Sequence, residues 1–245
     1  MTISSSIKNS LKNKKIHFSL IDPDKQSPKK AGILANIAEK SGSSAIMIGG
    51  STLSSKKQVD DTVKAIKNNC KLPAILFPSG AKYLSPYADA VFFMSLLNSN
   101  NLDYIIREHV IGAHFIKNSN IETISMGYVI VEPGMTVGRV GDVDLVKKDD
   151  FDTAIGYALS AQYFGMDFFY LEAGSGSDSP IPDLMIRKVK ESIDIPLIIG
   201  GGIREASIAK NKALAGADII VTGTTLEKEE NLEKKLSSIV KALEL

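Results

Sequence analysis

The sequence predicts a single α/β domain over residues 1–245, with the fold of a (β/α)8 TIM barrel. Eight strand-like segments recur along the chain, and several are continuously apolar, as strands buried on both faces of a parallel sheet are. Helix-like segments separate most of them, which is the pattern of α/β folds. The last two strands end in glycine just before a helix, and TIM barrels often bind phosphate after strands seven and eight. A doubly wound open sheet shares the alternation and is the structural alternative.

The elements are expected in the following order. Strands are expected at residues 16–21, 45–48, 74–77, 90–94, 123–131, 168–171, 197–199 and 219–221. Helices are expected at residues 28–40, 59–68, 152–164, 182–192, 205–215 and 227–243. The first of these helices has Ser27 as N-cap and Pro28 at its first position. Pro78, Gly80 and Pro86 break any helix between the third and fourth strands, so an irregular connection is expected there.

Composition excludes several classes of protein. The chain has 29 basic and 28 acidic residues, a net charge of +1, without the basic excess typical of nucleic-acid binding. A single cysteine, Cys70, allows neither an internal disulfide nor a cysteine zinc site. Residues 1–15 are polar and basic rather than signal-like, and no apolar run approaches the ~20 residues of a membrane span. A cytoplasmic protein is expected.

Oxygen-rich turns follow the first two strands. Asp22, Asp24 and Lys25 end the first, where the carboxylates either hold Mg²⁺ that bridges to substrate phosphates or form a local turn. The second strand is followed by two glycines and two hydroxyls, which offer backbone donors and an oxygen ligand: Gly49, Gly50, Ser51 and Thr52.

The fourth and fifth strands end in further polar groups. Ser95 and Asn98 are candidate donors to an anion. Glu132 is either a carboxylate of the site or a solvated loop residue. His17 is interpreted as a structural residue or one that alternates into the core, whereas His109 and His114 show no ligand spacing and are assigned no role.

The sixth strand ends in the most informative side chains. Tyr170 and Glu172 share one side of the strand by the period-two rule. If that side faces inward, Glu172 can accept a proton from a substrate hydroxyl. The following loop, Gly174, Ser175 and Gly176, is either a phosphate grip or a flexible linker, and its place directly after a buried strand favours the grip.

Glycine turns end the last two strands. Gly200, Gly201 and Gly202 follow the seventh strand, and Gly223 and Thr224 follow the eighth. Bare backbone N–H groups before a helix favour an anion, so these turns predict a phosphate cradle. Arg204 either binds phosphate or pairs with Glu205 or Asp183 at the surface.

Together, six motifs resemble the archaeal geranylgeranylglyceryl phosphate synthase family, in particular its larger subgroup: residues 17–25, 49–52, 93–99, 170–176, 200–204 and 221–224. The resemblance implies a TIM-barrel prenyltransferase. Such an enzyme joins geranylgeranyl diphosphate to sn-glycerol 1-phosphate, forms the first ether bond of archaeal membrane lipids and releases diphosphate. It also implies Mg²⁺, a homo-oligomer, and transient contact with a membrane surface.

The resemblance further implies roles for individual residues. Asp22 and Ser51 would hold the metal, with Thr52 as a competing oxygen, and Glu172 would take the proton. Glycerol phosphate would be held by Tyr170, Leu171, Glu172, Ala173, Gly174, Ser175, Gly176, Gly201, Gly202, Gly223 and Thr224.

The prenyl chain requires an apolar groove. We expect it at the irregular connection 77–86, with Tyr83 and Tyr87 in its wall. Three rival interpretations remain: a longer prenyl diphosphate, a barrel isomerase or synthase of amino-acid biosynthesis, and a non-catalytic barrel that binds a phosphometabolite.

Overall fold

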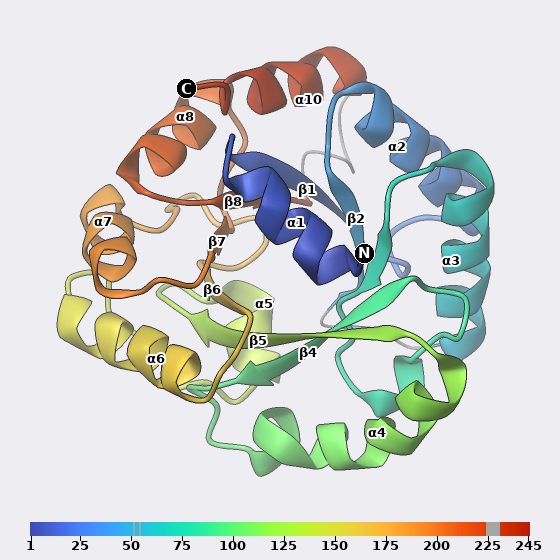
Figure 1. Ribbon diagram of the computed structural model, residues 1–245, viewed down its shortest axis with the longest axis horizontal. Coiled ribbons are helices and arrows are strands. Elements are labelled where there is room, and N and C mark those ends of the chain that lie inside the picture. Colours follow the sequence, from blue (N-terminus) through green and yellow to red (C-terminus); the bar gives the residue numbers. More distant parts are fainter. Residues whose placement is uncertain (51, 54, 224–230) are drawn as a thin grey trace.

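The computed structural model describes residues 1–50, 52, 53, 55–223 and 231–245. Eight parallel strands form a closed barrel in chain order (Figure 1). This confirms the predicted TIM barrel, because an open sheet would leave the first and last strands unpaired. The strands are β1 (Ile16–Ile21), β2 (Ala45–Ile48), β3 (Ala74–Leu76), β4 (Ala90–Leu96), β5 (Glu122–Ile130), β6 (Phe168–Glu172), β7 (Leu197–Gly200) and β8 (Ile219–Thr222).

Helices cover the outside of the barrel (Figure 1): α2 (Pro28–Lys40), α3 (Lys56–Asn69), α4 (Glu108–Ser119), α6 (Phe151–Tyr163), α7 (Asp183–Ser192), α8 (Ala206–Ala215) and α10 (Leu232–Lys241). The connection between β3 and β4 holds only a short 3-10 turn, η1 (Ala81–Tyr83), as predicted. A π-helical turn, η2 (Asp103–Arg107), leads into α4. The expected start of the last helix, residues 227–230, lies outside the described residues.

Strand residues alternate between two apolar layers. One set fills the barrel interior, among them Phe18, Met47, Phe92, Tyr128 and Tyr170. The alternate residues of the same strands pack outward against the helices. Burial on both faces explains why the strands read as continuous apolar runs.

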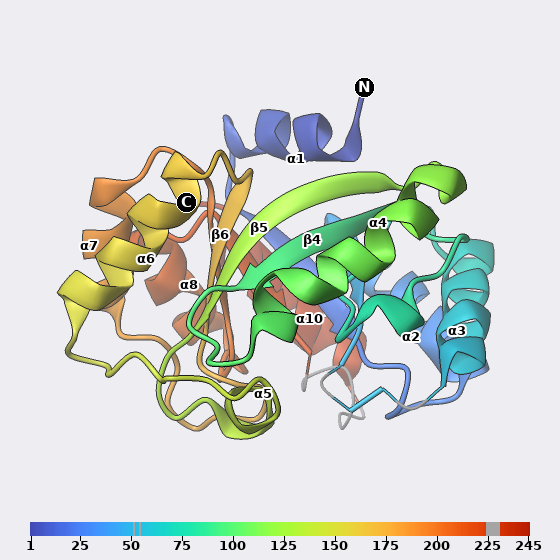
Figure 2. The same ribbon diagram turned by 90° about the horizontal axis from the view of Figure 1, so that it is seen from below.

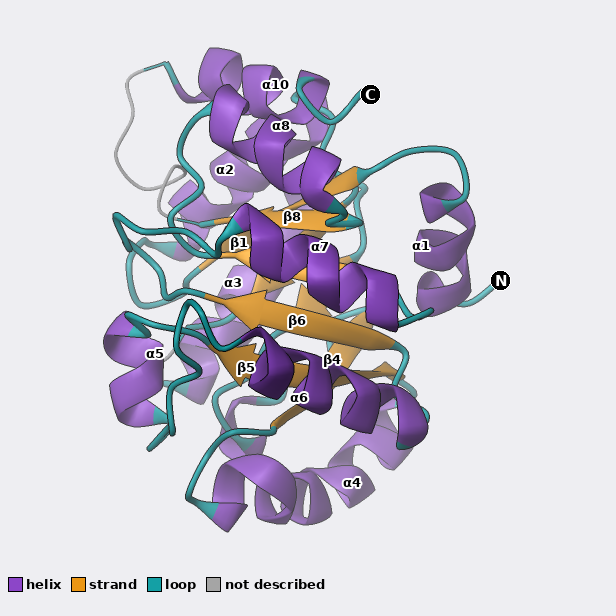
Figure 3. Ribbon diagram, turned by 90° about the vertical axis from the view of Figure 1, so that its left-hand side faces the viewer, coloured by secondary structure: helices purple, strands orange, loops and turns teal. Residues whose placement is uncertain are grey.

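Two further helices, absent from the sequence-based prediction, occupy opposite ends of the barrel: α1 (Ile3–Leu11) and α5 (Met135–Val140) (Figures 2 and 3). Ile3, Ile7 and Leu11 lie on one face of α1 and pack against the barrel interior. The carboxylate of Glu122 accepts hydrogen bonds from the N–H groups of Ile3 (2.5 Å) and Ser4 (2.7 Å), at the positive end of α1. This helix therefore closes the barrel floor. Among the described residues, no helix is long and apolar enough to cross a bilayer.

Candidate active site

A cavity of about 290 Å³ lies at the carboxyl ends of the strands. Its lining has a polar part and an apolar part. The polar part includes Asp22, Lys25, Glu172, Ser175 and Gly223. The apolar part begins at Phe77, just after β3, and runs along η1, β4 and α4, where it includes Leu84, Val91, Phe93 and Ile116. One continuous space therefore joins charged groups to a hydrophobic groove.

Glu172 is held at the inner wall of the cavity by two hydrogen bonds. The Tyr170 hydroxyl donates to its Oε2 (2.6 Å), and the N–H of Gly174 donates to its Oε1 (2.6 Å). Tyr170 and Glu172 both face into the barrel, as the period-two rule predicts. Burial raises the pKa of Glu172, and the two hydrogen bonds offset part of that rise. Burial, with the negative charge of Glu172, also raises the pKa of Tyr170 well above its usual value. Tyr170 is therefore a neutral donor that orients the carboxylate.

Gly200 makes room for this pair. A Cβ at Gly200 would lie 2.6 Å from the Glu172 Oε2, and closer still to the Tyr170 hydroxyl. Gly201, whose φ is +83°, would place a Cβ 2.8 Å from the backbone nitrogen of Gly174. The first glycines of the triplet are thus required by the packing of Glu172 and its partners, a reason that the sequence pattern alone did not reveal.

The glycine turns after β6 and β7 meet beside Glu172. Four glycines there have positive φ, which side chains rarely adopt: Gly174 (+96°), Gly176 (+80°), Gly201 (+83°) and Gly202 (+73°). Leu171 and Ala173 point their side chains into the outer apolar layer, so only their backbone can face a ligand. Ser175 and Gly223 line the cavity, whereas Thr224 lies outside the described residues.

Arg204 connects the same two turns. Its guanidinium donates to the Asp178 carboxylate (2.7 Å) and to the carbonyl oxygen of Gly176 (2.6 Å). The structure thus shows pairing with a carboxylate, although the partner is Asp178 and neither Glu205 nor Asp183.

Asp22 lies at the other side of the cavity, on the turn after β1. Its Oδ1 accepts a hydrogen bond from the N–H of Asp24 (3.0 Å), so the local turn is present. The Lys25 amine lies 3.7 Å from its Oδ2. A Cβ at Gly50 would lie 2.5 Å from the Asp22 carboxylate, so backbone approaches that carboxylate closely.

The metal prediction can be followed only in part. Ser51 lies outside the described residues, and Thr52 and Asp22 both line the cavity. Within the described ranges, no group of three or more His, Cys, Asp or Glu side chains is placed to hold a metal.

The prediction that Ser95 and Asn98, near the end of β4, donate to an anion is wrong. Asn98 is buried, donates to the carbonyl oxygens of Ile130 (2.9 Å) and Asp144 (2.8 Å), and accepts from the Ile130 N–H. Ser95 donates to the carbonyl oxygen of Ile105 (2.8 Å). Both therefore fasten loops to the barrel. Glu132 is half-buried and is not among the residues that line the cavity.

The predicted groove is present, but the two tyrosines are not in its wall. Tyr83 is buried and its hydroxyl donates to the carbonyl oxygen of Leu53, while Tyr87 is exposed beneath the Lys64 amine. The 3-10 turn directs Tyr83 into the outer core and leaves Leu84 at the groove.

Two further residues that line the cavity were not predicted from the sequence. Tyr128 lies 5.0 Å from Tyr170 between ring centroids, and its inward position on β5 could have been inferred from strand parity. His109, which was assigned no role, lines the groove with its ring 4.4 Å from that of Phe93.

Comparisons with known proteins agree over almost the whole chain. The PcrB family model matches residues 9–243. The geranylgeranylglyceryl phosphate synthase of Picrophilus torridus is 48% identical over 243 residues, covering 99% of this chain and 100% of that protein. The synthase of Methanosarcina acetivorans is 51% identical, covering 94% of this chain and 93% of its own length.

Solved structures give the same result. The crystal structure of (S)-3-O-geranylgeranylglyceryl phosphate synthase from Thermoplasma acidophilum, in complex with substrate sn-glycerol-1-phosphate, superposes with a TM-score of 0.97. It is 45% identical, and the match covers 99% of this chain and 98% of that one. A thiamine phosphate pyrophosphorylase from Pyrococcus furiosus, 17% identical with a TM-score of 0.61, shares only the fold. The chain belongs to the PcrB family, among its geranylgeranylglyceryl phosphate synthases.

Proposed function

We propose that this chain transfers the geranylgeranyl group of geranylgeranyl diphosphate to a hydroxyl of sn-glycerol 1-phosphate and releases diphosphate. The observation that carries the proposal is the continuity of the cavity. Glu172, Ser175 and Gly223 line its polar end, while the groove from Phe77 to Ile116 offers an apolar wall to a long prenyl chain. Family relatives are named for this product, and one is described with sn-glycerol-1-phosphate bound.

Glu172 accepts the proton in this reaction. The allylic carbon–oxygen bond of the prenyl diphosphate breaks and its electron pair leaves with diphosphate. The glycerol oxygen forms the new carbon–oxygen bond, and its proton passes to the carboxylate of Glu172. Burial raises the pKa of this carboxyl, which strengthens it as a base. Tyr170 and Gly174 fix both carboxylate oxygens, so the base is oriented before the substrate arrives.

The glycine turns orient the acceptor. Gly201, Gly202 and residues 175–176 lie in turns beside Glu172, where their backbone N–H groups would bind the phosphate, and Gly223 approaches from β8. A phosphate held there would direct one glycerol hydroxyl toward Glu172. Positioning of this kind supplies a large share of the barrier reduction in transfers between two bound substrates.

Mg²⁺ fits the opposite end of the cavity. Asp22 would hold it together with Ser51 or Thr52, since Mg²⁺ often takes one or two protein carboxylates and completes its shell with water and phosphate oxygens. When bound, the ion would neutralise charge on the leaving diphosphate. Asp22 and Thr52 both line the cavity there, which supports an oxygen site for a hard cation.

A single assay tests the proposal. The protein is incubated with sn-glycerol 1-phosphate, Mg²⁺ and prenyl diphosphates of graded length, and the ether product is measured. We expect the highest kcat/KM with geranylgeranyl diphosphate and no turnover after chelation. Product from longer chains alone would support the longer-chain alternative. Glycerol phosphate binding without product would support the binding-protein alternative.

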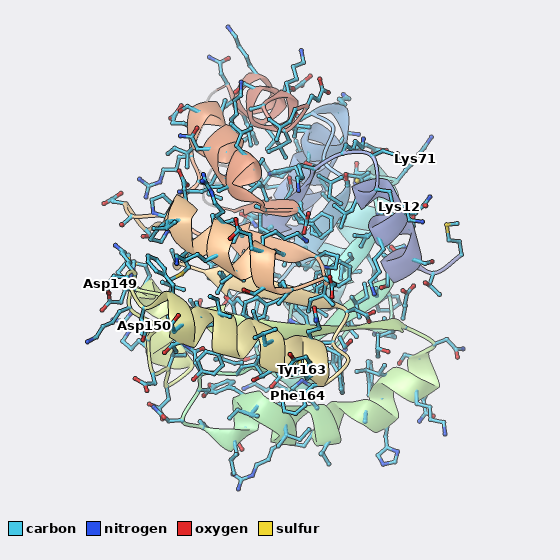
Figure 4. The ribbon with its side chains drawn as sticks, turned by 60° about the vertical axis from the view of Figure 1, so that its left-hand side comes forward. Lys12, Lys71, Asp149, Asp150, Tyr163 and Phe164 are labelled. Atoms are coloured by element: carbon cyan, nitrogen blue, oxygen red, sulfur yellow. The ribbon has the colours of Figure 1, made fainter. Side chains whose placement is uncertain are left out.

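The exposed apolar surface and the lipid nature of the product suggest how the chain associates and where it acts. Two sets of exposed apolar residues are candidate contacts between copies of the chain: Leu102, Ile106 and Val110 along η2 and α4, and Tyr163 and Phe164 at the end of α6 (Figure 4). We propose a homo-oligomer in the cytoplasm that delivers its lipid product by transient contact with a membrane surface. Light scattering and vesicle co-sedimentation test these two points separately.

A further inference from the structure

Four buried polar side chains lie behind the phosphate end of the site, in the layer between strands and helices: His17, Ser19, Ser43 and Thr222. None is more than 4% exposed. The ring nitrogens of His17 lie 2.9 Å from the Ser43 Oγ and 2.9 Å from the Thr222 Oγ1. The hydroxyls of Ser19 and Ser43 lie 3.0 Å apart. The four side chains form one connected network, called here the His17 cluster.

The His17 cluster occupies a place that is apolar elsewhere on these strands. Ile21 on β1, Ile46 on β2 and Ile220 on β8 fill the same outward layer and are fully buried. Hydrogen-bonded polar groups give little net stability over well-packed apolar ones, but they impose defined distances and directions. The cluster therefore specifies geometry more than it adds stability.

The geometry it specifies is the end of β8. On one side, β8 pairs with β7 only as far as Ile199 and Ile220. On the other, it pairs with β1 up to Ser19 and Thr222. The last two residues of β8 are thus held in the sheet by β1 alone, and Thr222 is bonded directly to His17 of that strand.

The next residue, Gly223, enters the cavity. A Cβ there would lie 3.4 Å from the Leu20 side chain, so Gly223 rests against β1 on the inner side. The end of β1 itself is fixed independently, because it pairs with β2 as far as Ile21 and Ile48. Loss of the cluster should therefore loosen the end of β8 more than the end of β1.

We propose that His17 is a positioning residue that acts through Thr222 to hold Gly223 against the phosphate of the glycerol substrate. This inference rests on the proposed function and adds a residue to it. His17 suits the task because a neutral imidazole has one donor and one acceptor nitrogen, and burial lowers its pKa to about 3, so it stays neutral. The cluster thus needs no counter-charge.

The test uses the full-length chain with substitutions in the cluster. In Thr222→Val and in His17→Leu, the KM for sn-glycerol 1-phosphate should rise about tenfold, as expected when one buried hydrogen bond is lost. The kcat and the KM for the prenyl diphosphate should stay within about twofold. Thr222→Ser keeps the hydroxyl and should restore the glycerol phosphate KM. The glycerol phosphate KM of the double variant should match that of the single ones, because each substitution already removes the His17–Thr222 bond that holds the end of β8.

Ile220→Val is the matched control, since it lowers packing on the same strand and the same layer without touching the cluster. It should lower the melting temperature and leave every KM unchanged. An unchanged glycerol phosphate KM in Thr222→Val and His17→Leu, with a lowered melting temperature, would overturn the inference. Titration calorimetry with sn-glycerol 1-phosphate distinguishes failure of this inference from failure of the proposed function. If the unsubstituted chain neither bound nor turned over this compound, the proposed function itself would be overturned.

Discussion

Replacing the proton acceptor by its amide is the sharpest test of the site. Glu172→Gln preserves the shape of the side chain and removes its basicity. One partner of Glu172, the Tyr170 hydroxyl, can turn its proton and accept from an amide, so the surrounding hydrogen bonds can persist. The other, the Gly174 N–H, can donate to the amide oxygen.

The expected loss is in kcat. Proton transfer by a positioned side chain contributes about 10²–10⁴-fold, so kcat should fall by that factor. The KM for sn-glycerol 1-phosphate should change only a few-fold, since the glycine turns keep their shape. A fall in kcat with little change in KM indicates an interaction that operates in the transition state.

The same substitution should alter the pH profile and should not lower stability at neutral pH. Burial raises the pKa of Glu172 above its usual 4.5, so the activity of the unsubstituted chain should fall as pH drops through that raised value. A raised folded-state pKa means that the stability contributed by Glu172 is present at low pH and is lost as pH rises through that pKa. At neutral pH Glu172→Gln should therefore melt at the same temperature or higher.

Ether formation measured by product chromatography, together with thermal melting, distinguishes the outcomes. Tyr170→Phe is the control, because it removes one orienting bond and leaves the base; its loss should be smaller. A kcat for Glu172→Gln within about threefold of the unsubstituted chain would refute the assignment of Glu172 as the proton acceptor.

Four further outcomes are expected. Gly200→Ala forces a Cβ against Tyr170 and should cost about 1–3 kcal/mol in denaturant unfolding, as overpacking does; unaltered unfolding would contradict the packing described. Asp22→Asn should shift the Mg²⁺ activation curve to higher concentration by tenfold or more, and an unchanged curve would remove Asp22 as a ligand. Gly112→Val narrows the groove and should raise the KM for geranylgeranyl diphosphate more than that for a shorter chain; equal effects would place the chain elsewhere. His17, with its pKa lowered to about 3, should make stability rise with pH between about 3 and 6.5 by up to ~1.4 kcal/mol per pH unit, a slope that His17→Leu should reduce in acid-unfolding experiments.

The barrel could be predicted because its strands are buried on both faces. Continuous apolar runs such as Ile46 to Ile48 are typical of strands that are buried on both faces, and few folds other than a parallel α/β fold contain many of them. Helix α1 was missed although its signal was present: Ile3, Ile7 and Leu11 recur every four residues, but polar residues separate them. Period-two parity also places Tyr170 and Glu172 on one side, as the structure has them.

The site predictions that were wrong or incomplete concern residues whose roles depend on long-range contacts. The partners of Asn98 lie 32 and 46 residues away, at the carbonyl groups of Ile130 and Asp144, and no local pattern reveals them. The direction of Tyr83 depends on a 3-10 turn whose geometry the surrounding prolines do not determine. Position 200 requires glycine because of the Tyr170 side chain. Tyr170 lies on the neighbouring strand β6, so no motif near Gly200 reveals this contact.

The space that Gly200 leaves for Tyr170 and Glu172 constrains how the chain can vary. A side chain at position 200 would overlap both the Tyr170 hydroxyl and the Glu172 carboxylate, so a smaller residue at position 170 would remove only one of the two clashes. Losing the tyrosine removes the donor that orients Glu172, so a change at either position alone is harmful. Libraries that randomise positions 170 and 200 and keep Glu172 should therefore recover active variants that almost all retain glycine at position 200.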